Sequence, residues 1–208
     1  MKFNNRGLFI SFEGPEASGK STQIKLLQKF FKNKKIPFIV TREPGGTPTS
    51  EKLRKIILDK KQLISTTEEI LLLMSSRLNH LNNVIKPALK DGKIVITDRF
   101  ADSTFVYQGF VNNFGLKKTM NLHKELLENF LPSKTFLFLL PISEISKRLK
   151  KRKFANKYDK IDTLFHSKVI SGYKKLSKNN KRFVTINAKL NVDKIQKSVL
   201  KSIKELLK

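Results

Sequence analysis

Near its amino terminus the chain carries GPEASGKS at residues 14–21, which follows the pattern G-x-x-x-x-G-K-[ST]. Glycines in such a loop let backbone N–H groups turn inward and cradle phosphate oxygens. The lysine can reach the β- and γ-phosphates of a nucleotide, and the next hydroxyl can ligate Mg²⁺. A glycine turn that binds nothing is the alternative, but the pattern lies between an expected strand and an expected helix. The residues predicted to hold a nucleoside triphosphate are Gly14, Pro15, Glu16, Ala17, Ser18, Gly19, Lys20, Ser21 and Thr22.

Glu16 places a carboxylate inside this loop. A carboxylate there would face a bound nucleotide, where it can accept a hydrogen bond from a sugar hydroxyl. The alternative is an ordinary solvated loop acid.

Arg42 follows the second expected strand, in the segment TREPGGT at residues 41–47. Ligands of open α/β sheets bind beyond the carboxyl ends of the strands. The planar guanidinium of arginine suits a bidentate grip on phosphate. The residues EPGG that follow are typical of a tight turn, which is the alternative explanation for residues 43–46. We therefore expect Arg42 to bind phosphate.

Asp98 and Arg99 stand at the end of the third expected strand, again at a carboxyl end. Asp98 can hold Mg²⁺ through water, and Arg99 can bind the phosphate of an acceptor. An internal Asp–Arg pair that stabilises the loop is the alternative. Arg77 follows an apolar run on a long expected helix, so it should lie near the core and need a partner, such as a base edge or a carboxylate.

The basic stretch at residues 150–160 (KKRKFANKYDK) has no clear apolar period. A mobile basic loop in a phosphoryl-transfer enzyme can close on ATP and neutralise charge on the transferred group. An ordinary solvated loop is the alternative for most of its lysines.

Short apolar runs separated by helical periodicity indicate an α/β fold with a parallel sheet. Thr66 or Thr67 is expected to cap the longest helix, and Pro87 to kink or end its last turn. The expected strands are residues 8–12, 36–41, 93–97, 135–140 and 182–187. The expected helices are residues 18–31, 50–59, 67–89, 102–108, 116–130, 142–150, 162–178 and 192–207. Pro37 suggests that the second strand begins there or lies at an edge.

The composition fits one globular domain over residues 1–208, with a mobile lid at about residues 150–160. Hydrophobic residues make up 39 %, and cysteine is absent, which excludes disulfides and thiolate chemistry. The chain has no long apolar run and no recognisable signal peptide, so we expect a cytoplasmic location without membrane contact. The formal net charge of +26 raises the question of a nucleic-acid surface. Because the lysines are dispersed, solvated helix faces are the favoured explanation.

Taken together, FEGPEASGKST, TREPGGT, VIKPALKDGKIVITDR, YQG and FHSKVISGY resemble the thymidylate kinase family from about residue 8 to about residue 173. The resemblance implies a P-loop NTPase fold, with a five-stranded parallel sheet flanked by helices on both faces, and usually a homodimer. It also implies transfer of the γ-phosphoryl group of ATP to dTMP with Mg²⁺, a step in nucleotide biosynthesis.

The resemblance assigns roles to individual residues. Glu16 would read the deoxyribose 3′-hydroxyl, Arg42 and Arg99 would grip the dTMP phosphate, and Ser21 and Asp98 would support Mg²⁺. The expected catalytic residues are Lys20, Arg152, Arg99 and Glu16. The expected substrate-binding residues are Glu16, Arg42, Leu73, Arg77, Arg99, Ser103, Tyr107 and Gln108.

The chain departs from the family pattern in two features. Leu73 stands where the family normally has a phenylalanine that stacks on thymine, and a leucine offers apolar contact without a ring. The lid has Asn156 and Lys157 in place of an Asp-Arg element, and the loop at residues 14–22 has no arginine. In this family the catalytic arginine comes from that loop or from the lid, so the resemblance implies that Arg152 is the catalytic arginine, as in the bacterial lid-arginine type.

Three other functions stay open at this point. The same fold can phosphorylate another nucleotide or a nucleoside. A basic nucleic-acid-binding ATPase would turn over ATP in response to DNA or RNA, although no aromatic-interleaved strand face is evident. A regulatory nucleotide binder is disfavoured because Lys20, Ser21, Asp98 and Arg99 are all present.

Overall fold

The computed structural model describes residues 7–59, 61–150 and 163–207. Its centre is a five-stranded sheet with strand order β2-β3-β1-β4-β5. Every neighbouring pair of strands in the sheet is parallel. The strands are β1 (Leu8–Glu13), β2 (Phe38–Arg42), β3 (Ile94–Asp98), β4 (Lys134–Leu139) and β5 (Phe183–Asn187). The expected P-loop fold is confirmed, and β2 is an edge strand, as its preceding proline suggested.

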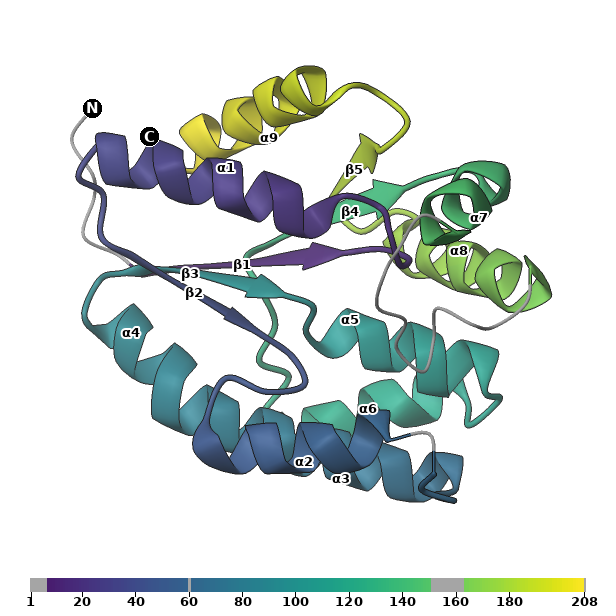
Figure 1. The fold of residues 1–208 in the computed structure, drawn as a ribbon. Coiled ribbons are helices and arrows are strands. Elements are labelled where there is room, and N and C mark those ends of the chain that lie inside the picture. The colour runs from purple at the N-terminus through teal and green to yellow at the C-terminus, as the bar shows by residue number, and fades with distance from the viewer. Residues whose placement is uncertain (1–6, 60, 151–162, 208) are drawn as a thin grey trace.

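Helices cover both faces of this sheet (Figure 1). The helices are α1 (Lys20–Asn33), α2 (Pro48–Leu58), α3 (Thr66–His80), α4 (Lys86–Lys90), α5 (Ala101–Thr104), α6 (Leu116–Leu127), α7 (Ile142–Lys150), α8 (Thr163–Ser177) and α9 (Val192–Leu206). Two π-helical segments are η1 (Leu81–Ile85) and η2 (Phe105–Val111).

Each face of the sheet has its own apolar core. The helices α1 and α9 pack on one face, where Ile24, Leu27 and Phe31 of α1 are buried at helical spacing. On the other face, Ile70 and Met74 of α3 pack with residues of η1, α4, α5 and α6 against Phe9 and Val95. The strands are thus buried from both sides, which explains their uninterrupted apolar sequences.

The long helix predicted at residues 67–89 is divided in the structure. The helix α3 is capped by Ser65, whose hydroxyl accepts from Glu68 N while the Glu68 carboxylate accepts from Ser65 N. The cap is therefore Ser65, and not Thr66 or Thr67 as predicted. The chain then passes through η1 into α4, where Pro87 occupies the first turn. A break is expected at Pro87, because proline has no N–H to donate. In the structure this break is the π-helical segment η1, which precedes Pro87.

The register of the strands brings three polar residues to one edge of the sheet. Asp98 at the end of β3 pairs with Phe12 of β1 and with Arg42 of β2. Glu13 follows Phe12 and ends β1, immediately before the loop that leads into α1. The carboxyl ends of β1, β2 and β3 therefore carry the candidate site.

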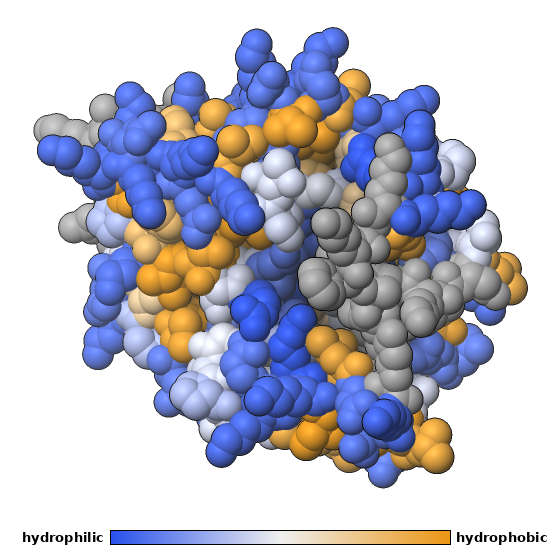
Figure 2. Space-filling model, in the orientation of Figure 1, coloured by the Kyte–Doolittle hydropathy of each residue, from blue (hydrophilic) through white to orange (hydrophobic). Residues whose placement is uncertain are grey.

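Hydrophilic residues are spread over the face of the molecule shown in Figure 2, with apolar residues between them. The lysines of the outer helices contribute to this surface. Exposed examples on α1 and α9 are Lys25, Lys29, Lys194, Lys197 and Lys201. Among the described residues, no helix has the length and apolar character needed to span a membrane.

Candidate active site

The loop between β1 and α1 has the geometry that its glycines predict. Gly14 has φ 133° and Gly19 has φ 92°, both in the region that favours glycine. A Cβ at Gly14 would also overlap the carbonyl oxygen of Phe138. The first turn of α1 begins at Lys20, so its free N–H groups and its positive dipole end face the loop. These features make an anion-binding site.

Lys20 is buried beneath this loop. Its Nζ donates to Gly14 O at 3.1 Å, to Pro15 O at 2.9 Å and to Ser18 Oγ at 3.3 Å. Burial lowers the pKa of Lys20 to about 8, and the nearby charge of Arg99 acts in the same direction. A bound phosphate would stabilise the charged ammonium group and replace these neutral acceptors.

Ser21 and Asp98 place two oxygen ligands beside the loop. Ser21 Oγ donates to Asp98 Oδ2 at 3.0 Å, which joins the start of α1 to the end of β3. A hydroxyl and one carboxylate are hard donors that suit Mg²⁺ when the remaining ligands are phosphate oxygens and water. The described residues contain no cluster of three or more His, Cys, Asp or Glu side chains that would form an all-protein metal cage.

Two cavities adjoin at this end of the sheet. One is lined by residues 16–22 together with Asp98, Arg99 and Arg54. The other is lined by residues of α2, α3, α5 and η2, with a partly apolar wall that includes Ile57, Leu58 and Leu73. The residues that line both cavities are Glu16, Glu43, Pro44, Leu58 and Arg99. The cavities therefore form one continuous site with Glu16 and Arg99 at the junction.

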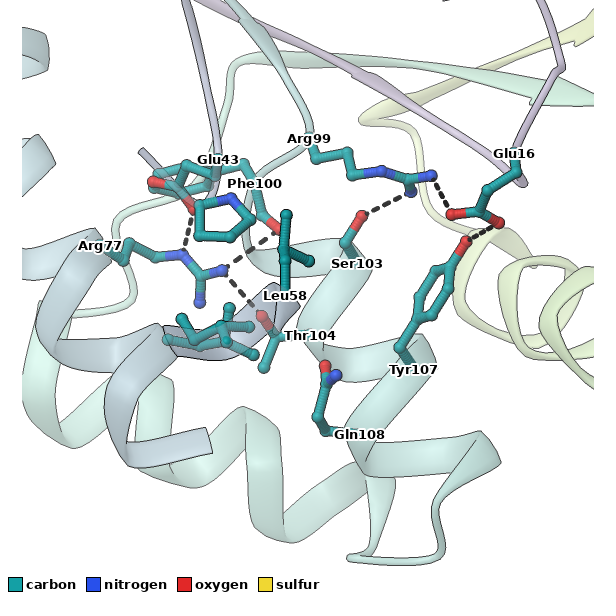
Figure 3. A pocket seen from close by; sticks show the side chains of 13 residues that line it. Glu16, Glu43, Leu58, Arg77, Arg99, Phe100, Ser103, Thr104, Tyr107 and Gln108 are labelled. Carbon is teal, nitrogen blue, oxygen red and sulfur yellow. Dashed lines mark hydrogen bonds and ion pairs between the residues drawn. The ribbon is translucent and has the colours of Figure 1, made fainter. Parts of the chain in front are cut away.

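Arg99, Glu16 and Tyr107 form a connected group at this junction (Figure 3). Arg99 Nη2 pairs with Glu16 Oε1 at 2.8 Å, and the Tyr107 hydroxyl donates to Glu16 Oε2 at 2.8 Å. Burial alone raises the pKa of Glu16, but the charges of Arg99 and Lys20 hold it below its usual value. Glu16 is thus a buried, ionised group rather than a solvated loop acid.

The backbone at Arg99 is in the left-handed region, with φ 71°. A non-glycine residue in this conformation is strained and persists only when its surroundings hold it there. Arg99 N donates to Phe12 O at 3.0 Å, and Thr97 Oγ1 donates to Arg99 O at 2.7 Å. The arginine is therefore locked in place, and its partner is Glu16 rather than the adjacent Asp98.

Arg77 lies on the wall of the second cavity opposite Tyr107 (Figure 3) and is 2 % exposed. Its Nε donates to Glu43 Oε2 at 2.7 Å, and its Nη2 donates to Thr104 Oγ1 at 2.8 Å and Phe100 O at 3.3 Å. The second Glu43 oxygen lies 3.0 Å from His80 Nδ1. The partner that the sequence required for Arg77 is thus a carboxylate, and Arg77 still lines the cavity.

Gln108 reaches into the cavity from η2, between Arg77 and Tyr107 (Figure 3). Ser103 lies one turn earlier and accepts from Arg99 Nη1 at 3.0 Å. Leu73 contributes to the apolar part of the wall and is 7 % exposed. An amide, a guanidinium and an apolar wall around one cavity can recognise a flat ring with polar edges.

Arg42, which the sequence analysis predicted to bind phosphate together with Arg99, lies near a second arginine, Arg54. Arg42 is about half exposed, and its Nη2 pairs with Glu51 Oε2 at 2.9 Å. It borders a shallow groove beside Ser21 and Asp98 and lines neither of the two cavities. Arg54, on α2, lines the first cavity, next to residues 16–22, and donates to Pro44 O at 2.7 Å. The role of Arg42 in binding phosphate stays a prediction, and Arg54 is a second candidate.

Sequence reasoning missed Arg54, although a signal for it was present. Ser50 and Ile57 are buried on α2, and Arg54 lies at i+4 and i−3 from them, hence on the same face of the helix. An arginine on an inward face close to TREPGGT is a candidate ligand for an anion.

Sequence reasoning also missed Arg148, on α7. It donates to Ala17 O at 3.2 Å and to Ala188 O at 3.1 Å. Ala17 has φ 56°, so Arg148 supports a strained position of the loop. Arg152, Asn156 and Lys157 lie outside the described residues, so the predicted lid arginine stays a prediction.

Comparison with known proteins gives a consistent result. Residues 12–199 match the model of the family described as thymidylate kinase. A thymidylate kinase of Caldanaerobacter subterraneus subsp. tengcongensis is 40 % identical over 204 residues, which cover 98 % of each chain. A thymidylate kinase of Mycoplasma capricolum is 40 % identical over 205 residues, covering 97 % of this chain and 96 % of the relative. The crystal structure of an Ehrlichia chaffeensis thymidylate kinase superposes with TM-score 0.75 at 28 % identity, covering 95 % of this chain and 99 % of that one.

Proposed function

Since the chain belongs to the thymidylate kinase family, its reaction is phosphoryl transfer from ATP to dTMP, giving ADP and dTDP, and we propose that its two adjoining cavities hold these nucleotides end to end. The observation that carries this proposal is the shared wall: Glu16 and Arg99 line both cavities. A phosphate bound at Arg99 is therefore next to one held by the loop of Lys20.

On the donor side, the loop at residues 14–22 binds the phosphates of ATP through its backbone N–H groups and Lys20. Ser21 and Asp98 would hold Mg²⁺, which would supply positive charge to neutralise the phosphates. The hydrogen bond between these two side chains supports this assignment, because it places their oxygens next to each other beside the loop.

On the acceptor side, Arg99 and Arg54 bind the phosphate of dTMP, and Arg77 and Gln108 address the polar edge of thymine. Leu73 and Pro44 offer apolar contact to the ring. Glu16 accepts from the deoxyribose 3′-hydroxyl, and Tyr107 lies against the sugar, where it crowds a 2′-hydroxyl. The positions of Arg77 and Tyr107 on opposite walls support this order along the nucleotide.

The chemistry requires alignment and charge neutralisation. A phosphate oxygen of dTMP is already ionised near neutral pH, so it can attack the γ-phosphorus in line without a general base. The bond to the β-phosphate oxygen of ATP breaks as the new P–O bond forms. Lys20 and Arg99 stabilise the negative charge on the transferred group, because both are cations preorganised before the substrates bind.

We also propose that the protein is a cytoplasmic homodimer. Leu71 and Leu78 are 54 % and 40 % exposed and lie seven residues apart on one face of α3. Met120 on α6, a helix that packs against α3, is 40 % exposed. A second copy that covers this face would remove these apolar side chains from water.

An acceptor panel tests the proposed function. ADP release, measured with ATP and Mg²⁺, is expected to be fastest with dTMP among dTMP, dUMP, dCMP, dAMP and thymidine. Loss of the thymine methyl group should lower kcat/KM for dUMP by roughly 10- to 200-fold. Faster turnover of another acceptor, or turnover stimulated by DNA or RNA without any acceptor, would replace this function with one of its rivals.

Arg54→Ala and Arg42→Ala form a matched pair that tests the phosphate site. A charged hydrogen bond contributes about 1.5–3 kcal/mol, so Arg54→Ala is expected to raise the KM for dTMP by roughly 10- to 100-fold. Arg42→Ala should have a smaller effect, because its guanidinium is occupied by Glu51 at the surface. Steady-state kinetics, with ATP and dTMP varied separately, measure the KM for each nucleotide in both variants. A larger effect at Arg42 would restore the assignment made from the sequence.

A further inference from the structure

Glu13 is a fully buried carboxylate at the end of β1 that the proposed binding sites do not use. Its side chain contacts Phe100, Ser103 and Tyr173. Oε1 accepts from Phe100 N at 2.7 Å. Oε2 accepts from Ser103 Oγ at 2.6 Å and from the Tyr173 hydroxyl at 2.8 Å. Burying a carboxylate is costly, and these three hydrogen bonds offset part of that cost.

The two hydroxyl groups bonded to Glu13 also contact Arg99. Arg99 Nη1 donates to Ser103 Oγ at 3.0 Å and to the Tyr173 hydroxyl at 3.3 Å. The two hydroxyl oxygens are themselves 3.0 Å apart. Glu13 is therefore connected to the guanidinium of Arg99 through two hydroxyl groups, that of Ser103 on α5 and that of Tyr173 on α8.

The direction of these hydrogen bonds depends on the charge of Glu13. A hydroxyl group has one proton to donate and two lone pairs that accept. An ionised Glu13 accepts the protons of both hydroxyls, so their lone pairs face Arg99. A protonated Glu13 donates to one of them, and that hydroxyl must then turn its own proton elsewhere, which weakens its acceptance from Arg99.

We propose that ionised Glu13 is a positioning residue for acceptor binding, which orients Arg99 through the hydroxyls of Ser103 and Tyr173. This inference rests on the proposed function, because it needs Arg99 to bind the phosphate of dTMP. The hydroxyls of Ser103 and Tyr173 accept from Arg99 Nη1 while Glu16 accepts from Nη2, so the guanidinium is clamped from two sides. A clamped guanidinium loses little further freedom when the phosphate binds.

The charge environment makes this arrangement sensitive to pH. Burial, together with the nearby charge of Asp102, raises the pKa of Glu13 to about 7, while Arg99 opposes the shift. Among the described residues, Lys20 on α1 and Tyr173 on α8 are further titratable groups that interact with Glu13. Glu13 is mostly ionised above pH 7 and mostly protonated below it. Between pH 8 and pH 6 its ionised fraction falls about tenfold, so the KM for dTMP should rise by up to about tenfold.

The experiment compares the KM for dTMP of the wild-type enzyme and Glu13→Gln from pH 6 to pH 8, with ATP saturating. At pH 8, Glu13→Gln should raise the KM for dTMP about tenfold and leave the KM for ATP unchanged. At pH 6 the two KM values should converge. The phosphate of dTMP also titrates near pH 6, but that contribution is common to both enzymes and cancels in their ratio. Glu13→Asp, which keeps a carboxylate, should retain a pH-dependent KM.

The decisive quantity is the KM for dTMP of Glu13→Gln divided by that of the wild type at the same pH. A ratio that stays constant from pH 6 to pH 8, or a ratio near one at pH 8, would overturn the inference. If Glu13→Gln does not fold, Tyr173→Phe takes its place, because it removes one of the two hydroxyls and should raise the KM for dTMP several-fold at pH 8. An unchanged KM in Tyr173→Phe would then overturn the inference. Arg99→Met separates the two proposals: if it leaves the KM for dTMP unchanged, the acceptor site itself is misplaced.

Discussion

Lys20→Met is expected to lower kcat by roughly 10²- to 10⁴-fold, with the fold retained. The magnitude is that of preorganised cations that stabilise charge on a transferred phosphoryl group. Lys20 is buried, and its Nζ donates to Gly14 O, Pro15 O and Ser18 Oγ. Those neutral acceptors keep the ammonium group beside the loop that we propose binds the β- and γ-phosphates of ATP. A methionine fills the same volume without the charge.

Two controls separate this effect from loss of the site. The melting temperature of Lys20→Met should stay within a few degrees of the wild-type value, and calorimetry should show that dTMP binds with little change in affinity. A kcat within threefold of the wild type would contradict the role of Lys20. Weakened dTMP binding would instead indicate that the loop as a whole had moved.

Features that depend on neighbouring residues were predictable from the sequence. The strands are short apolar runs because both of their faces are buried, and this pattern is visible in one segment at a time. The loop from Gly14 to Ser21 is likewise local, since its glycines and its lysine act within one turn of the chain. Arg99 and Asp98 could be placed because the end of a parallel strand points to the binding edge.

Features that depend on pairs distant in the sequence could not be predicted. Arg77 clearly needed a partner, but nothing in its surroundings pointed to Glu43, which is 34 residues away. The link from Glu13 to Tyr173 spans 160 residues and exists only because α8 packs against η2. The π-helical turns η1 and η2 have no pattern of their own in the sequence. They arise where Pro87 and the tightly packed residues 105–111 interrupt α-helical bonding.

Arg77→Met is expected to destabilise the protein by about 3–5 kcal/mol, the largest effect on stability among the changes considered. It leaves the carboxylate of Glu43 buried with His80 as its remaining side-chain partner, and an uncompensated buried charge is costly. For a domain of this size, the melting temperature should fall by roughly 6–20 °C. The matched surface control is Arg42→Ala, whose exposed pair with Glu51 contributes about 0–1 kcal/mol.

The double variant Arg77→Met/Glu43→Gln distinguishes this cause from a cavity effect. If the cost comes from the unpaired charge of Glu43, removing that charge should restore most of the stability, because an apolar and neutral pair of similar volume replaces the ion pair. Urea unfolding of the wild type and the three variants measures the coupling. A double variant no more stable than Arg77→Met would mean that packing, and not charge, holds Arg77. In both cases dTMP binding should remain weak, because the guanidinium that we propose contacts the base is gone. Recovered stability without recovered binding would therefore separate the two roles of Arg77, one in the core and one in the site.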